Sequence, residues 1–163
     1  MHTLKWLGEA GAIALMAETL SRRTLPADWI GIGDDAAVTT LPGEGRVMTT
    51  CDVLVEDSHF RRATTSAEDL GWKALAVNVS DIHGMGGQPG WAVIGLALPG
   101  DLPVEWLEGL YRGLAAASEA LGTPVVGGDS VGSPGPIALS VTVVGQAARP
   151  RLRSAARPGD LVV

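Results

Sequence analysis

Two long apolar segments with helical spacing separate short β-rich runs along this chain. The first, residues 66–84, begins with the capping-box-like Ser66-Ala67-Glu68-Asp69 and ends in a group of glycines. The second, residues 103–121, begins at a proline and ends before Gly122. The β-rich runs occupy residues 36–41, 46–51, 91–98 and 137–145. Because the order of the elements mixes hairpin and crossover connections, we predict an α+β fold with a mixed or antiparallel sheet flanked by helices.

The two ends of the chain carry weaker patterns. Residues 4–20 have an apolar spacing compatible with a helix, and Pro42-Gly43-Glu44-Gly45 predicts a hairpin turn between the first two β-rich runs. Near the other end, a turn at residues 157–160 leads into an apolar strand that needs a partner for its backbone groups. We therefore expect one domain over residues 1–148, and a linker with the first strand of a truncated second domain over residues 149–163.

Composition narrows the classes of partner. The formal net charge is -6, and the arginines are scattered in small groups rather than in a basic stripe, which argues against a nucleic-acid surface. The apolar run at residues 10–17 is bracketed by Glu9 and Glu18, so it is too short for a membrane span. The single cysteine, Cys51, excludes an internal disulfide framework. We expect a cytoplasmic protein without nucleic-acid or membrane partners.

Four aspartates lie at glycine-flanked or strand-end positions, where side chains often form ligand sites. Asp35 follows a glycine-softened turn, Asp52 ends a β-rich run, Asp81 lies near the end of the first helical segment, and Asp129 follows two glycines. Any one of them alone is equally explained as an ordinary turn residue, and Asp34 is a second choice beside Asp35. Their combination predicts that the four carboxylates gather to bind magnesium, which prefers hard oxygen donors.

Other candidate residues have plain alternatives. Asp81 lies where the helix macrodipole disfavours an anion, so it is either a tolerated exposed aspartate or, among its apolar neighbours, one with a cation nearby. Alone, His59 is typical of a structural or exposed histidine, Cys51 of a small buried side chain and Glu56-Asp57 of a solvated loop. The chain has no P-loop, dinucleotide-binding glycine motif or nucleophile elbow, and its three histidines give little support to a histidine metal centre or a Ser-His-Asp triad.

Four motifs resemble, in order and spacing, those of thiamine-monophosphate kinase. They are GIGDDAA at residues 31–37, CDVLVEDSHF at 51–60, NVSDIHGMGG at 78–87 and GGDS at 127–130. The resemblance implies the N-terminal domain of the aminoimidazole-ribonucleotide synthetase-like fold, so that residues 1–148 bind ATP and magnesium and form a homodimer by joining two sheets into a barrel. It also implies that a second domain completes the site.

The same resemblance implies roles for individual residues. It places magnesium ligands at Asp35, Asp52, Asp81 and Asp129, with further metal contacts from Thr50 and Cys51. It places nucleotide contacts at Tyr111, Gly128, Asp129 and Arg153. It gives His59 the thiamine-phosphate-binding position.

Three positions depart from the family pattern. Cys51 stands where threonine is frequent, Asp57 where glycine is usual, and His83-Gly84 where two alanines are common. Cys51 could therefore contact a metal only through its backbone. The role of Tyr111 rests on spacing within a helix, so packing is an equal alternative, and Arg153 has the alternative of an ordinary surface arginine on a basic connector.

The resemblance implies transfer of the γ-phosphoryl group of ATP to thiamine monophosphate, which gives thiamine diphosphate and ADP. The acceptor phosphate has a second pKa of about 6, so no side-chain base is required. The difficulty is bringing two polyanions together, and magnesium ions held by carboxylates would relieve it. Two other functions stay open: another ATP-dependent enzyme of the same superfamily, and a noncatalytic fragment that dimerises or binds ATP.

Overall fold

The computed structural model describes residues 10–11, 14, 26–30, 34–41 and 45–161. The helix expected over residues 4–20, the hairpin turn at residues 42–45 and the strand at the end of the chain lie largely outside these ranges. Within them, no helix is long and apolar enough to cross a membrane.

Five strands form one sheet in the order β1-β2-β5-β3-β4. The strands are β1 (Ala37–Leu41), β2 (Gly45–Val55), β3 (Gln88–Leu98), β4 (Val125–Gly132) and β5 (Ala138–Gln146). β3 and β4 are parallel, whereas the β1–β2, β2–β5 and β5–β3 pairs are antiparallel. This arrangement confirms the predicted α+β class with a mixed sheet.

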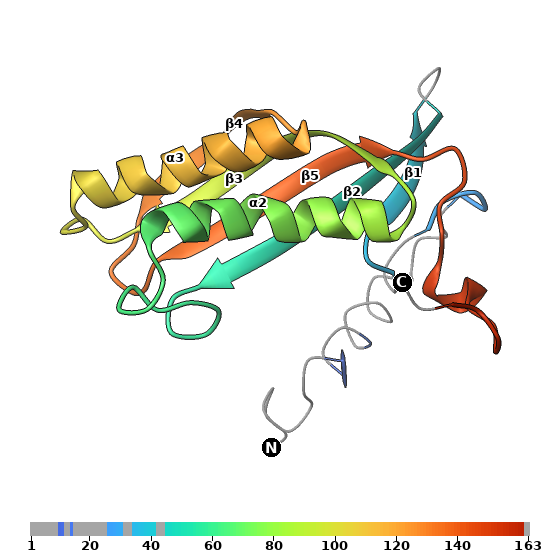
Figure 1. The fold of residues 1–163 in the computed structure, drawn as a ribbon, viewed down its shortest axis with the longest axis horizontal. Helices are drawn as coiled ribbons and strands as arrows, with labels where there is room; N and C mark the ends of the chain where they lie inside the picture. Colours follow the sequence, from blue (N-terminus) through green and yellow to red (C-terminus); the bar gives the residue numbers. More distant parts are fainter. Residues whose placement is uncertain (1–9, 12–13, 15–25, 31–33, 42–44, 162–163) are drawn as a thin grey trace.

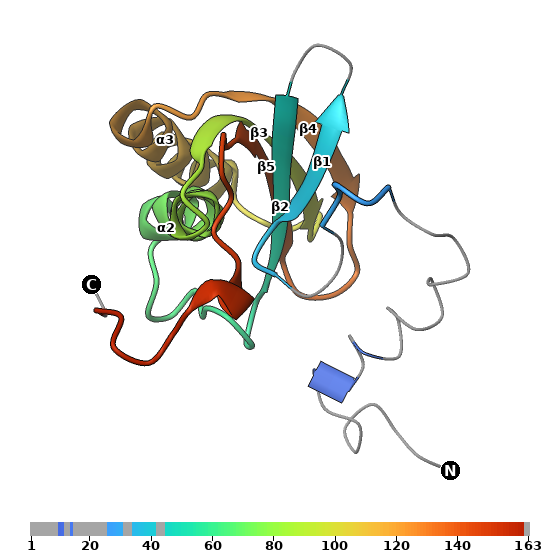
Figure 2. The same cartoon turned by 90° about the vertical axis from the view of Figure 1, so that its right-hand side faces the viewer.

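Helices α2 (Ala67–Gly84) and α3 (Val104–Leu121) cover the same face of the sheet (Figures 1 and 2). Their ends follow the signals in the sequence. The Ser66 hydroxyl accepts a hydrogen bond from the Asp69 backbone N–H at the start of α2, and Gly122 after α3 has a left-handed conformation with φ of 63°. α3 also forms the crossover that makes β3 and β4 parallel.

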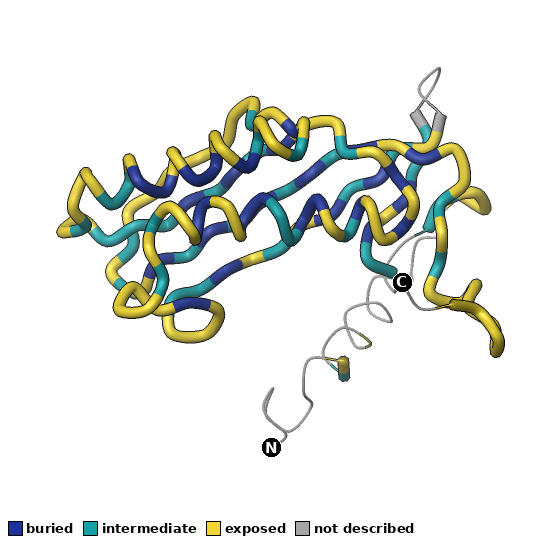
Figure 3. The backbone as a smooth tube through the Cα atoms, in the orientation of Figure 1, coloured by how far each residue is buried: buried dark blue, intermediate teal, exposed yellow. Residues whose placement is uncertain are grey.

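The core lies between the helices and the sheet (Figure 3). Its buried side chains include Met48 from β2, Leu75 from α2 and Val141 from β5, each at most 1% exposed. The two helices also touch each other closely, because a Cβ atom at Gly113 would overlap the Glu68 carbonyl oxygen. A side chain at this position would therefore push α3 away from α2.

Two strands are longer than the sequence predicted. β2 continues past Cys51 because its residues keep pairing with β5, as far as Val55 opposite Ala138. In the sequence, the β-rich pair Val125-Val126 is followed by two glycines, which predicts that the strand opens into a turn there. Instead, β4 continues through Gly127-Gly128 to Gly132 because it pairs in parallel with β3. In both strands the pairing partner lies far away in the sequence, so local residue preferences do not reveal the full length.

The chain turns back directly after β2, around Asp57. Asp57 is the one non-glycine residue with a positive φ, 66°, in the part of the chain that the structure describes. Its backbone N–H donates to the Phe60 carbonyl at 2.8 Å, and the His59 N–H donates to the Val55 carbonyl at 2.9 Å. Phe60 is only 6% exposed, so it anchors the turn to the core. The left-handed backbone explains why glycine suits this position.

We expect Asp57→Gly to leave the free energy of unfolding unchanged or to raise it by up to about 1 kcal/mol, because glycine adopts positive φ without steric cost. Asp57→Val should lower it by about 1–2 kcal/mol. Urea unfolding measures both variants. Ser58→Gly is the matched control, since φ is not positive at Ser58 and glycine should lower stability there. Equal destabilisation by Asp57→Gly and Ser58→Gly would contradict this account of the turn.

Candidate functional site

Beyond the end of β1, a side chain of helix α2 provides the hydrogen-bond partner for the free edge of β2. The β1–β2 pairing ends at Ala37 opposite Thr49. Beyond that point the Asp52 backbone N–H donates to the side-chain oxygen of Asn78 at 2.9 Å, and the Asn78 side-chain nitrogen donates to the Ala74 carbonyl at 3.0 Å. Asn78 is 0% exposed. These two bonds therefore fix Asp52 against α2 away from water.

Asp81 lies on the same side of α2 as Asn78, three residues further along. Its Oδ2 accepts a hydrogen bond from the Thr50 hydroxyl at 2.7 Å, and Thr50 is only 5% exposed. Burial raises the pKa of Asp81. The Thr50 hydrogen bond opposes this effect, the charges of Asp52 and Asp35 add to it, and the Arg153 charge opposes it. Burial is thus the main cause of the raised pKa, and repulsion from the two neighbouring carboxylates adds to it.

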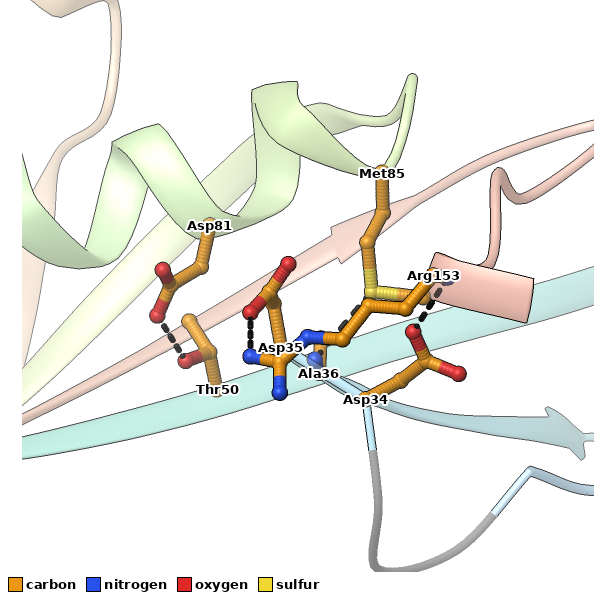
Figure 4. Close-up of polar contacts among 7 residues, drawn as sticks. All are labelled: Asp34, Asp35, Ala36, Thr50, Asp81, Met85 and Arg153. Carbon is orange, nitrogen blue, oxygen red and sulfur yellow. Dashed lines mark hydrogen bonds and ion pairs between the residues drawn. The ribbon is translucent and has the colours of Figure 1, made fainter. Parts of the chain in front are cut away.

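Asp35 completes this acidic group from the segment before β1 (Figure 4). Its carboxylate forms an ion pair with the Arg153 guanidinium, and the Arg153 backbone N–H donates to Asp34 Oδ1 at 2.9 Å. Arg153 belongs to the short 3-10 helix η1 (Arg153–Ala155), which follows β5. Asp34, the neighbour of the candidate metal ligand Asp35, therefore fixes the backbone of Arg153. The sequence did not reveal the contact between Arg153 and either aspartate.

Met85, the residue that caps α2, holds these segments together (Figure 4). The Ala36 backbone N–H donates to the Met85 sulfur at 3.1 Å, and the Arg151 backbone N–H donates to the Met85 carbonyl at 2.8 Å. Met85 itself is 1% exposed. The segments that carry Asp35 and Arg153 are thus fixed to the same buried residue.

Asp129 lies in a different place, on the outer strand β4. Gly128 packs against β3 so closely that a Cβ atom would overlap the Ile94 carbonyl oxygen. Beside it opens a pocket of about 440 Å³ lined by Ile94, Tyr111, Val125 and residues 127–130. Three of the predicted nucleotide contacts, Tyr111, Gly128 and Asp129, therefore share one pocket.

The strand register separates this pocket from the acidic group of Asp35, Asp52 and Asp81. Asp129 pairs with Gly95, Gly95 with Ser140, and Ser140 with Val53, which follows Asp52. Three interstrand steps correspond to about 14 Å. Within one chain, the structure thus brings together three of the four predicted aspartates and leaves Asp129 apart, because α3 carries β4 to the far edge of the sheet.

His59 and Cys51 also lie apart from the carboxylates. His59 follows β2 and contacts Val55, and the three residue steps along the strand from Asp52 to Val55 span about 10 Å. Its Nδ1 accepts a hydrogen bond from the Val55 backbone N–H at 3.0 Å, and the ring is exposed. Cys51 is exposed on the face of β2 opposite Thr50, 3.3 Å from the Ser140 hydroxyl. The alternative of a small buried cysteine is therefore wrong, and only the backbone of Cys51 lies on the side of the acidic group.

The donors in this acidic group fit magnesium by type. Asp35, Asp52 and Asp81 offer hard carboxylate oxygens, Thr50 adds a hydroxyl, and the charges of Asp35 and Asp52 contribute to the raised pKa of Asp81. As the side chains stand, no three histidine, cysteine, aspartate or glutamate residues among those described are grouped closely enough to hold a metal ion.

Comparison with known proteins shows the family to which the chain belongs. It matches the family described as AIR synthase related protein, N-terminal domain, over residues 33–147. Thiamine-monophosphate kinase of Aquifex aeolicus is 42% identical over 159 residues, covering 98% of this chain and 49% of that protein. The Bacillus subtilis kinase of the same name is 38% identical over 135 residues, covering 82% of this chain and 42% of that protein. The chain spans about half the length of the curated relatives it matches.

Solved structures show the same relationship. The structure of AaThiL complexed with AMPPCP and TMP aligns with a TM-score of 0.85 and 40% identity, covering 96% of this chain and 48% of that chain. The HypE–HypF complex aligns with a TM-score of 0.69 and 21% identity, covering 93% of this chain and 47% of that chain. The second similarity concerns the fold alone.

We expect Asp81→Asn to raise the free energy of unfolding of the metal-free protein at pH 7. The raised pKa means that folding favours the neutral carboxyl, and asparagine is neutral while its side-chain oxygen can still accept the Thr50 bond. The gain should shrink as pH falls through the raised folded pKa toward the ordinary value of 3.8, where aspartate is also protonated.

Urea unfolding at several pH values, with a chelator present, measures this difference. Asp101→Asn is the matched control, because Asp101 is an exposed aspartate in the loop after β3 and should change stability by no more than about 0.5 kcal/mol. A loss of stability in Asp81→Asn at pH 7 would contradict the prediction.

Proposed function

The chain belongs to the AIR synthase related family, whose N-terminal domain it contains, and we propose that it binds ATP and magnesium for the phosphorylation of thiamine monophosphate. The reaction gives thiamine diphosphate and ADP. Similar proteins are named thiamine-monophosphate kinase, and a structural neighbour, AaThiL, is complexed with AMPPCP, an ATP analogue, and TMP. The observation that carries the proposal is the acidic group of Asp35, Asp52 and Asp81, held together by β2, α2 and Met85.

Asp35, Asp52 and Asp81 would hold magnesium, with Thr50 supporting Asp81. The ion would supply positive charge to the two phosphate-bearing substrates and to the transferring group. The chain's own contribution is rigidity. The Asp52 backbone is tied to buried Asn78, and the Asp81 carboxylate is tied to nearly buried Thr50. Ligands fixed in this way need little rearrangement when the ion binds.

The nucleotide occupies the pocket on β4. Gly128 keeps the strand close to Ile94, and Tyr111, which is 46% exposed, offers a ring at the pocket wall. Asp129 lines this pocket and also the hollow on the open face of the sheet, and its Oδ1 accepts the Ser130 backbone N–H at 2.9 Å. Asp129 then serves a metal ion that accompanies the phosphates, rather than the ion held by the other three aspartates.

His59 recognises the phosphate of the acceptor. Because Nδ1 accepts the Val55 backbone N–H, the neutral ring carries its proton on Nε2, which is free to donate to a phosphate oxygen. Lys73 steadies this loop, since its Nζ donates to the His59 carbonyl at 2.9 Å. No side chain has to remove a proton from the acceptor, because its phosphate is already anionic.

The uncovered face of the sheet pairs with a second copy of the chain. Helices α2 and α3 lie on the same face of the sheet (Figure 2). Of the described residues, Val53 and Val131 belong to the other face and are 50% and 53% exposed. Both line a hollow of about 220 Å³ whose lining is mostly apolar, with Asp129 and Ser140 as its polar members. Small apolar side chains on an open sheet face suit the pairing of two sheets into a homodimer.

We expect Asp52→Asn to weaken binding of magnesium and AMPPCP by at least about tenfold, because it removes a charged ligand while the Asn78 bond to its backbone remains. Calorimetry measures the affinity, with Asp101→Asn as the control.

His59→Ala should weaken binding of thiamine monophosphate to the AMPPCP-loaded protein, whereas His83→Ala, which removes an exposed histidine at the end of α2, should not.

Turnover is measured as ADP release with thiamine monophosphate as acceptor and with thiamine as the control acceptor. A nucleotide affinity that does not change in Asp52→Asn would refute the metal site. Tight magnesium and AMPPCP binding without any affinity for thiamine monophosphate would support another enzyme of the same superfamily.

We expect Val53→Glu to convert the homodimer into a monomer, because it places a charge in the centre of the apolar sheet face. Analytical ultracentrifugation at micromolar concentration measures the mass. Val104→Glu is the matched control, since Val104 is 68% exposed but lies on α3, away from this face. A monomeric unsubstituted chain, or a dimer that persists in Val53→Glu, would rule out this interface.

A further inference from the structure

Arg153 contacts the acidic group in two different ways. Its backbone N–H donates to Asp34 Oδ1 at 2.9 Å, and its guanidinium forms an ion pair with Asp35 (Figure 4). The backbone contact is part of a fixed segment, because the Arg151 N–H binds the Met85 carbonyl and Leu152 packs against the core. The Arg153 side chain, in contrast, is 65% exposed. The guanidinium can therefore leave Asp35 without moving the segment that carries it.

The guanidinium also lies where an incoming metal ion would compete with it. Asp35 is one of the three carboxylates of the acidic group, and its Oδ1 is engaged by Arg153. A single guanidinium carries one positive charge and contacts Asp35. The Asp81 carboxylate accepts a hydrogen bond from the neutral Thr50 hydroxyl, and the bond between Asp52 and Asn78 involves the Asp52 backbone rather than its carboxylate. A divalent ion balances more of this charge than Arg153 does.

Resting on the proposed function, we propose that Arg153 is a placeholder cation, which holds Asp35 until a divalent metal ion displaces its guanidinium. Two cations that compete for one carboxylate weaken each other's binding by the same factor. Once displaced, Arg153 stays beside the metal because its backbone remains bound to Asp34. Its guanidinium is then free to donate two parallel hydrogen bonds to a phosphate oxygen pair.

This exchange makes metal and nucleotide binding cooperative. Before the metal binds, the guanidinium is engaged with Asp35 and is less available to a phosphate. After the metal binds, the same side chain is released toward the nucleotide. Arg153 therefore opposes the binding of metal alone and favours the binding of the metal–nucleotide pair.

Calorimetric titration of the full chain with magnesium chloride, without nucleotide, tests this inference. Arg153→Gln should bind magnesium more tightly than the unsubstituted protein, by up to about fivefold for an exposed pair. Arg151→Gln is the matched control, because it removes the same charge from a residue that lies two positions before Arg153 in the same anchored segment. The magnesium affinity of this variant should equal that of the unsubstituted protein. Arg153→Lys keeps the charge, so its magnesium affinity should fall between those of Arg153→Gln and the unsubstituted protein.

In a second titration, with AMPPCP in saturating magnesium, the substitution should change the affinity in the opposite direction. Arg153→Gln should bind the analogue more weakly, because the released guanidinium is missing. A variant that had merely lost structure would weaken both titrations. Magnesium affinity of Arg153→Gln equal to or below that of Arg151→Gln overturns the placeholder role and leaves the proposed function intact. Absence of magnesium binding in all of these proteins overturns both.

Discussion

The hydrogen bond from the Asp52 backbone to the buried Asn78 side chain holds the acidic group together. β1 stops pairing with β2 at Thr49, so beyond that residue this edge of β2 faces α2, while the other edge still pairs with β5. An unpaired buried amide costs about 1–3 kcal/mol, and Asn78 removes this cost for Asp52 while bonding to its own helix through Ala74. The observed position of α2 along β2 satisfies both groups. That position also brings Asp81 to Thr50, so the metal ligands follow from a structural requirement of the backbone.

The chain balances charge differently at its two groups of acidic residues. In the loop after β2, Glu56 accepts a hydrogen bond from Arg62 at 2.5 Å and one from the Ile137 N–H at 3.2 Å, and the Arg62 bond is the main cause that lowers the pKa of Glu56. At the candidate metal site the pKa of Asp81 is raised instead, mainly by burial. A carboxylate with a permanent partner stabilises the fold, whereas one left short of positive charge retains affinity for a cation.

Local signals in the sequence predicted the helices well and the arrangement of the site only in part. The capping residues Ser66 and Gly122 act through neighbouring atoms, so both helix boundaries could be predicted. The full lengths of β2 and β4, and the distance between Asp129 and the other aspartates, depend on strand order, which no local pattern contains. Asn78 was visible within the Asn-Val-Ser-Asp motif, three residues before Asp81, and a polar residue on an apolar helix face was the available signal for its role. The contact of Arg153 with Asp35 joins residues 118 positions apart and left no such signal.

The close contact between the helices supports the site from a distance. At Gly71 and Gly113, added Cβ atoms would overlap the carbonyl oxygens of Leu110 and Glu68, so the two helix backbones meet directly near the start of α2. Such a contact leaves α2 little freedom to slide or rotate on the sheet, because displacement by a fraction of an ångström would cause steric overlap. The other half of the same rigid helix carries Asn78 and Asp81. Small residues at one end of α2 therefore help to keep the carboxylates at the other end within reach of β2, although they touch no ligand themselves.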